Sequence, residues 1–222
     1  AADPRRDVCL LTGDTASGYR EAGYLPAAVL NFLALLGWNP GNDEEVMSLE
    51  RLTELFSLER VGKSGVKFDY KKAEWFNQVY LRQQAPAALV PTLRASLAAR
   101  GISEAGFSDE YLAQAVALLQ DRVSYLPQLA EWGAYLFAPP AHYDADMAAK
   151  RWTAETARFV GSLGNAYSAV HDGAWTAAEL ESVFKQRAEQ MGLAPGKALP
   201  ALRLAVTGMA FGPGVFDVLA LL

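Results

Sequence analysis

Apolar residues recur at helical spacing along most of this chain, and this spacing limits the fold more than any other feature. The stripe Leu112, Ala115, Leu119 and Val123 is typical, because residues three or four positions apart share one face of a helix. Ser108 precedes that stripe, and serine is a favoured helix N-cap. No run alternates apolar and polar residues for long enough to require a sheet. The sequence therefore predicts an all-α fold.

Prolines and capping residues divide this pattern into parts. Asp69 is placed to cap a helix that Pro86 stops, and beyond Pro86 the composition shifts to alanine and leucine. The Pro139-Pro140 pair marks a second boundary. We expect an irregular lead-in over residues 1–22, followed by three helical domains over residues 23–85, 86–140 and 141–222.

Smaller signals predict individual helices inside these domains. One helix is expected from Pro91 to Arg100 and another from Leu129 to Phe137. Thr176 and Glu179 have the spacing of a capping box, in which two side chains satisfy each other's backbone N–H groups at a helix start.

The composition is that of a globular protein with a substantial core, since 51% of the residues are apolar and 20% are charged. The apolar run Val29–Leu36 is far shorter than the roughly 20 residues that a membrane span needs. Ala1–Asp7 is polar, without the apolar stretch of a signal peptide. Cys9 is the single cysteine and cannot form an internal disulfide. We expect a cytoplasmic protein that does not enter membranes.

The sequence carries no recognisable pattern for catalysis or metal binding. His142 and His171 lie in different segments, and neither has a Cys, Asp or Glu at ligand spacing on its own helix. The hexapeptide Gly192–Lys197 (GLAPGK) has three residues between its glycines where the phosphate-binding P-loop has four, and no strand precedes it. We therefore expect no metal site and no catalytic residue in this chain.

One window carries a local excess of positive charge, although the net charge of the chain is −5. From Arg60 to Arg82 there are six basic residues and two acidic ones, with aromatic residues such as Phe68 and Trp75 among them. Such a window fits either a solvated helix whose aromatic rings join a core, or a surface that contacts RNA phosphates. Charge alone leaves both interpretations open.

The same window contains ordered sequence blocks with a specific resemblance. Residues 23–38 read GYLPAAVLNFLALLGW, residues 56–64 read FSLERVGKS, and residues 75–81 read WFNQVYL. In this order they resemble bacterial glutamyl-tRNA synthetases, in the region that leads from the catalytic domain to the anticodon-binding domains. Thr15–Arg20 is closest to the Bacteroidetes-type version. The resemblance continues through Ala115–Arg122 and the blocks LRLAVTG and GPGVF, with the alanine-rich middle matched mostly by pattern.

This resemblance implies a C-terminal fragment of a class I synthetase with helical, helix-cage anticodon-binding subdomains. The HIGH-type and KMSKS-type signatures of the family do not occur, and the chain does not begin with methionine. The parent enzyme would attach glutamate to tRNA(Glu) with ATP and Mg²⁺. The fragment would bind the RNA as a monomer, with no cofactor, no DNA partner and no catalysis of its own.

The resemblance also implies which residues contact the RNA. Arg122 matches the family position that contacts the first anticodon base, where arginine is typical of enzymes that accept only glutamate tRNA. Phe211, beside Gly212, is unusual for the family, and the sequence leaves open whether its ring stacks on a base or is an exposed or core-filling aromatic. The implied anticodon-binding residues are Arg122, Arg203, Gly212, Pro213 and Val215, and the implied stem-binding residues are Lys63, Trp75, Asn77, Tyr80 and Arg82.

A different function class remains as the alternative. An acidic, all-helical chain also suits a protein-interaction module without RNA binding, because nonspecific nucleic-acid binders are usually basic overall. The two hypotheses differ in whether transfer RNA binds the chain at low salt.

Overall fold

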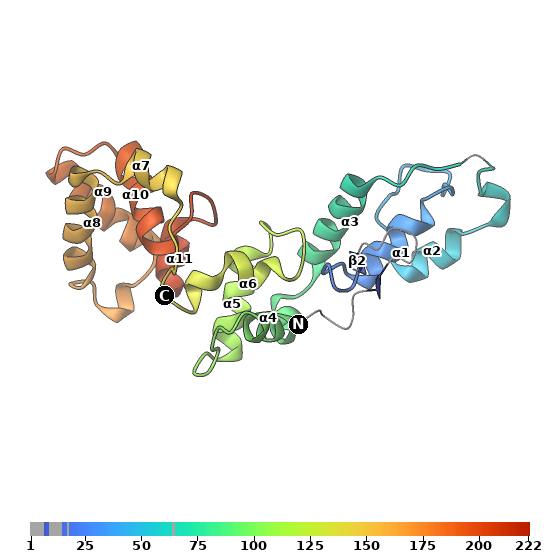
Figure 1. The fold of residues 1–222 in the computed structure, drawn as a ribbon, viewed down its shortest axis with the longest axis horizontal. Coiled ribbons are helices and arrows are strands. Elements are labelled where there is room, and N and C mark those ends of the chain that lie inside the picture. The colour runs from blue at the N-terminus through green and yellow to red at the C-terminus, as the bar shows by residue number, and fades with distance from the viewer. Residues whose placement is uncertain (1–6, 9–14, 17, 64) are drawn as a thin grey trace.

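A computed structural model describes residues 7–8, 15–16, 18–63 and 65–222 of the chain. Figure 1 shows an elongated molecule built almost entirely of helices, with α1–α3 at one end, α4–α6 in the middle and α7–α11 at the other end. The all-α prediction is confirmed. In the lead-in, β1 (Asp7–Val8) and β2 (Thr15–Ala16) pair antiparallel, with Asp7 opposite Ala16. The rest of that predicted lead-in before Gly18, including Cys9, lies outside the described residues.

The N-terminal part consists of helices that enclose an aromatic core. Its elements are α1 (Pro26–Ala34), α2 (Leu49–Leu55), the 3-10 turn η1 (Leu58–Arg60) and α3 (Tyr70–Gln83). As predicted, Asp69 caps α3, and its carboxylate accepts hydrogen bonds from the backbone N–H groups of Lys71 (2.9 Å) and Lys72 (3.2 Å). Phe32 and Phe76 are buried together beneath α1 and α3.

The central part corrects two predicted helix boundaries. Its elements are α4 (Pro86–Ala99), α5 (Asp109–Leu119), α6 (Gln128–Trp132) and the 3-10 turn η2 (Ala134–Leu136). α4 begins at Pro86 and not at Pro91, because proline suits the first helical turn and Pro91 lies at an exposed position inside the helix. The predicted helix from Leu129 to Phe137 is broken at Gly133, where an added Cβ would lie 2.4 Å from Leu119 Cδ1.

The C-terminal part is a group of helices around a second large core. Its elements are α7 (Ala145–Arg151), α8 (Ala154–Tyr167), η3 (Asp172–Ala174), α9 (Ala177–Gln190), α10 (Pro195–Thr207) and α11 (Val215–Leu221). The capping box predicted at Thr176 is only half formed. Its hydroxyl accepts from the Glu179 N–H (3.3 Å), while the Thr176 N–H donates to the Ala174 carbonyl. A complete capping box joins Thr153 and Thr156 at the start of α8.

The buried clusters follow the order of the chain, except that two residues belong to the cluster of a neighbouring part. The central cluster contains the buried residues of α4–α6, and it also takes in Leu81 from the end of α3 and Val218 from α11. The C-terminal cluster runs from Phe159 to Val215. α3 and α11 therefore each contribute side chains to two cores, and these helices tie the three parts together.

Candidate nucleic-acid interface

The loop between α5 and α6 presents Arg122 to solvent. We call residues 120–127 the Arg122 loop. The Arg122 backbone N–H donates to the Leu119 carbonyl (2.8 Å), which continues the helical course of α5 by one step. Within the described residues, its guanidinium forms no hydrogen bond or ion pair with the protein. This places an exposed set of five N–H donors on a short loop between two packed helices.

The Arg122 loop is held in place by an amide from the N-terminal part. Asn77 Oδ1 accepts from the Leu25 N–H (2.7 Å), and Asn77 Nδ2 donates to the carbonyls of Ser124 (2.6 Å) and Gly23 (3.3 Å). Gly23 has a φ of 89°, and an added Cβ there would lie 2.3 Å from Pro127 Cδ. The GYLP block therefore approaches the loop so closely that only glycine fits at its first position.

Further hydrogen bonds near Asn77 join the N-terminal and central parts. The buried Gln120 side chain donates to the carbonyls of Leu81 (2.7 Å) and Gln84 (2.8 Å). Arg82 Nη2 donates to the Asp121 carbonyl (3.0 Å), and its Nε lies 3.7 Å from Asp121 Oδ1. Arg82 therefore reaches the residue next to Arg122 and remains partly exposed on the same surface.

Two of the residues predicted to contact the RNA stem, Asn77 and Tyr80, lie in the interior of the protein. Asn77 is 0% exposed and uses its side-chain amide on the backbone contacts above. Tyr80 is buried, and its hydroxyl forms hydrogen bonds with Asn31 Oδ1 and the Met47 carbonyl. Because these polar atoms are already paired inside the fold, we assign both residues to positioning and not to direct RNA contact.

Arg203, on α10, is partly buried beside the turn before α11. Arg203 Nη1 donates to the Pro213 carbonyl (2.6 Å). Burial lowers the pKa of the Arg203 guanidinium, the nearby Tyr135 hydroxyl opposes that effect, and the Arg122 charge adds to it. Arg203 is therefore held against the turn that contains Gly212 and Pro213, two of the other residues predicted for the anticodon.

Tyr135 is the residue of this surface that sequence reasoning missed. It is only 6% exposed, and its hydroxyl has no hydrogen-bond partner. Burial raises the pKa of Tyr135 to about 12, while the positive charge of Arg203 acts in the opposite direction. A Cβ at Gly212 would lie 3.5 Å from Arg203 Nη1 and 3.8 Å from the Tyr135 hydroxyl, so the Gly212 backbone borders both groups.

The turn before α11 combines an exposed aromatic ring with two buried residues. Phe211 is 53% exposed, and its ring meets that of Trp132 edge to face at 5.4 Å. Pro213 and Val215 are buried, and Val215 belongs to the C-terminal core. Any base contact at these two positions would therefore use backbone groups, whereas the Phe211 ring is accessible to a ligand.

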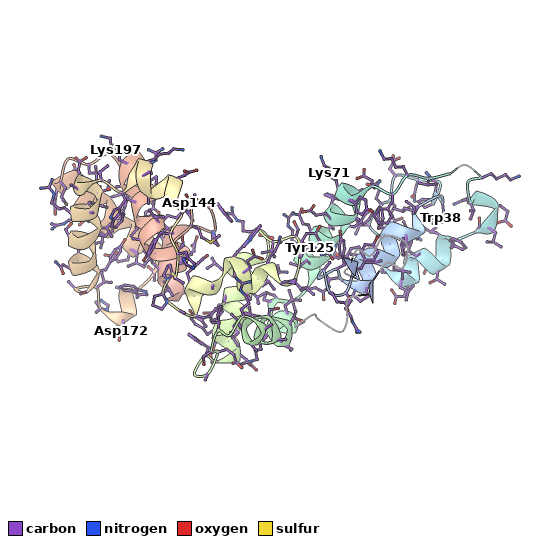
Figure 2. The ribbon with its side chains drawn as sticks, viewed as in Figure 1. Trp38, Lys71, Tyr125, Asp144, Asp172 and Lys197 are labelled. Atoms are coloured by element: carbon purple, nitrogen blue, oxygen red, sulfur yellow. The ribbon has the colours of Figure 1, made fainter. Side chains whose placement is uncertain are left out.

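Some cations of the basic window near α3 are engaged within the protein. Lys72 forms an ion pair with Glu45, whereas Arg60 keeps its charge and donates to the Pro40 carbonyl. The cations that remain exposed include Lys63, in the loop before α3, and Lys71, which Figure 2 shows at the rim of the N-terminal part. Trp75 is half-exposed, with its ring packed edge to face against Phe76 at 4.9 Å. RNA contact by Lys63, Trp75 and Arg82 stays a prediction.

Neither a metal site nor a membrane helix is found in the part of the chain that the structure describes. No three His, Cys, Asp or Glu side chains in it gather as they would around a metal ion. Among the same residues, no helix combines the length and the apolar character that crossing a membrane demands.

Two protein-family models match this chain. Residues 81–222 match the family model described as an anticodon binding domain. Residues 8–75 match the model for the catalytic domain of class I tRNA synthetases for E and Q. The division into domains over residues 23–85, 86–140 and 141–222 stays a prediction.

Comparison with curated proteins and solved structures gives consistent relatives. The chain is 40% identical, over 95% of its length, to a glutamate–tRNA ligase from Porphyromonas gingivalis, and 40% identical over 93% to that from Bacteroides fragilis. It spans 41% and 40% of those two proteins. A crystal structure of a glutamate tRNA ligase from Elizabethkingia meningosepticum superposes with a TM-score of 0.85 at 32% identity, covering 98% of this chain and 42% of that one. The resemblance inferred from the sequence blocks is confirmed.

Proposed function

Because this chain belongs to the family of anticodon-binding domains, we propose that it recognises tRNA(Glu) as the C-terminal part of a glutamate–tRNA ligase. The anticodon would lie against Arg122, Arg203 and the turn at Phe211 and Gly212. The stem would lie toward Lys63, Trp75 and Arg82. In this proposal Asn77, Tyr80, Pro213 and Val215 support these surfaces from inside.

The observation that carries this proposal is the exposed Arg122 guanidinium, which forms no hydrogen bond or ion pair within the described residues. A rigid fork of N–H donors that the protein leaves unused suits the base carbonyls and phosphates of an RNA. Arg203, whose Nη1 donates to the Pro213 carbonyl, and the exposed Phe211 ring would extend this surface.

The proposal extends to the parent enzyme. That enzyme would activate glutamate with ATP and Mg²⁺ and transfer it to tRNA(Glu), in the cytoplasm, while this part holds the RNA and does no chemistry. The catalytic signatures are absent from this sequence, and the relatives that the chain matches are more than twice as long. We propose that the chain acts as a monomer, without a cofactor of its own and without DNA as a partner.

The test is RNA binding by an Arg122→Gln variant. Glutamine keeps an amide but loses the rigid pair of donors and the charge, so affinity for tRNA(Glu) should fall roughly tenfold. Arg100→Gln, at the exposed end of α4, is the matched control and should leave binding unchanged. Gel shifts against tRNA(Glu), tRNA(Gln) and an unrelated tRNA at two salt concentrations measure this effect. Equal binding of all three RNAs by the original chain would refute selective recognition.

The protein-interaction alternative has no particular observation in its favour. It predicts that no tRNA shifts the chain at low salt, so the same gel decides between the two hypotheses.

A further inference from the structure

α7 has an apolar hollow beside it that the proposed anticodon contacts do not use. The hollow has a volume of about 400 Å³, which is within the size range of small-ligand sites. Its lining is mostly apolar and includes two aromatic side chains that remain open to solvent, Tyr143 (53% exposed) and Trp152 (43% exposed). The lining residues are Tyr143, Ala148, Trp152, Leu204 and Ala205.

Next to this hollow lies a smaller basic cavity of about 150 Å³. Three cationic side chains line it, Lys150, Arg151 and Lys197, with Glu155 as the single acid. None of these three cations forms an ion pair within the described residues. Their positive charge is therefore available to a ligand.

The two cavities lie along the same helices. α7 packs against α10. Ala148 of α7 and Trp152, the residue directly after α7, both line the hollow, and Arg151 at the end of α7 directly precedes Trp152. On α10, Lys197 and Leu204 are seven residues apart, which places them on one face with a rise of about 10 Å between them. The apolar and basic cavities are thus neighbours, since Trp152 lines the first while Arg151 and Thr153 on either side of it line the second.

We infer that α7 and α10 form a second RNA subsite, in which an unpaired base stacks against Trp152 and Tyr143 while adjoining phosphates contact Lys150, Arg151 and Lys197. Exposed aromatic rings beside unpaired cations are the combination that binds single-stranded nucleic acid. The inference rests on the proposed function and adds an RNA-binding site separate from Arg122 and Arg203.

The chemistry of the subsite sets what it contributes. The hollow offers ring faces and few polar groups, so it accepts any base and reads no sequence. Thr153 and Thr156 already cap the start of α8, so the attraction for phosphate comes from side-chain charges and not from free helix N–H groups. The subsite therefore adds affinity to every RNA that reaches it, whereas Arg122 distinguishes among RNAs.

The experiment compares four variants of the 222-residue chain by fluorescence anisotropy with labelled tRNA(Glu). Trp152→Ala should weaken binding by roughly 5- to 100-fold, and Trp152→Phe, which keeps a stacking ring, should restore most of that affinity. Lys150→Ala combined with Lys197→Ala should reduce the slope of log affinity against log salt by roughly 1 to 2. Lys185→Ala is the control, because Lys185 is an exposed lysine on α9 that pairs with Glu181.

The outcomes separate this inference from the function on which it rests. If the original chain binds tRNA(Glu) while Trp152→Ala and the double lysine variant bind it as well as Lys185→Ala does, the subsite is refuted and the anticodon proposal stands. If the original chain binds no RNA at low salt, both are refuted. Circular dichroism melts of each variant establish that a lost affinity does not come from unfolding. If an unrelated tRNA and tRNA(Glu) lose equal affinity in Trp152→Ala, the sequence-independent character of the subsite is supported.

Discussion

The two junctions that join the three parts of this molecule differ in how much hydrogen bonding they contain. The junction between the N-terminal and central parts, here called the polar junction, adds hydrogen bonds from Asn77, Arg82 and Gln120 to backbone groups to the apolar contact of the buried Leu81. The junction between the central and C-terminal parts is largely apolar, with Val218 of α11 buried in the central core. Val206, Met209 and Leu221 pack against that core from the same side.

This difference indicates what each junction does. Hydrogen bonds are directional, so the polar junction fixes the position and orientation of the Arg122 loop relative to the GYLP block. Apolar burial is non-directional and scales with area, so the apolar junction supplies cohesion between the two anticodon-binding parts. We expect the first junction to control where Arg122 points, and the second to determine whether the anticodon surface exists at all.

The largest expected effect is that of Val218→Asp in the apolar junction. Val218 is 0% exposed, and an unpaired carboxylate there should lower the free energy of unfolding by about 4 kcal/mol or more. Thermal unfolding followed by circular dichroism measures the loss, and hydrogen exchange at Leu112 and Leu180 reports on the central and C-terminal cores separately.

Leu222→Asp is the control, because Leu222 is exposed at the end of the chain and should tolerate the charge. If exchange accelerates at Leu180 alone while Leu112 stays protected, the two parts fold independently. The apolar junction would then provide less cohesion than its burial indicates.

The next largest effect should follow from Asn77→Ala in the polar junction. The substitution leaves the part-buried Leu25 N–H and the buried Ser124 carbonyl without this partner, which should cost about 2 kcal/mol of the free energy of unfolding. It should also reduce selectivity for tRNA(Glu), because the Arg122 loop loses its support while Arg122 itself remains.

Urea denaturation and the gel-shift comparison of tRNAs measure these two effects. Asn165→Ala, at an exposed position of α8, removes an amide of the same size and should change neither quantity. A variant of Asn77 that is destabilised yet fully selective would show that the junction supports the fold without positioning Arg122.

The helices were predictable because their signals are local. Asp69 and Ser108 cap α3 and α5 as expected, since a cap depends on residues only two or three positions away. The wrong boundaries arose where local signals were ambiguous. Pro86 both follows one helix and opens the next, and Gly133 interrupts an apolar stretch because of its contact with Leu119.

The site was predictable only where a family resemblance supplied the position. Arg122 and Arg203 were predicted in this way, and their RNA contact stays a prediction. The supporting role of Asn77 could not be read from the sequence, because its partner Ser124 is 47 residues away. Tyr135 gave no signal either, since a tyrosine in an apolar stretch looks the same whether or not its hydroxyl is paired.

Within the apolar junction, Tyr135 departs from the contrast between the two junctions. Its buried hydroxyl lacks a partner and faces Arg203 from the other part. The pKa of Tyr135 is raised from 10.0 to about 12, so the unfolded chain loses this proton first as pH rises. The stability contribution is therefore complete below pH 10 and is lost as pH rises through about 12.

Tyr135→Phe tests this exception and should have the smallest effect. Near pH 7 it should change the free energy of unfolding by less than about 1 kcal/mol, because no hydrogen bond is lost. At pH 11 the original chain should lose about 1 kcal/mol that the variant retains. Urea denaturation at pH 7 and pH 11 measures both values, with Tyr143→Phe, an exposed tyrosine, as the control. A large loss in Tyr135→Phe at pH 7 would mean that the hydroxyl is paired after all, and that both junctions depend on hydrogen bonds.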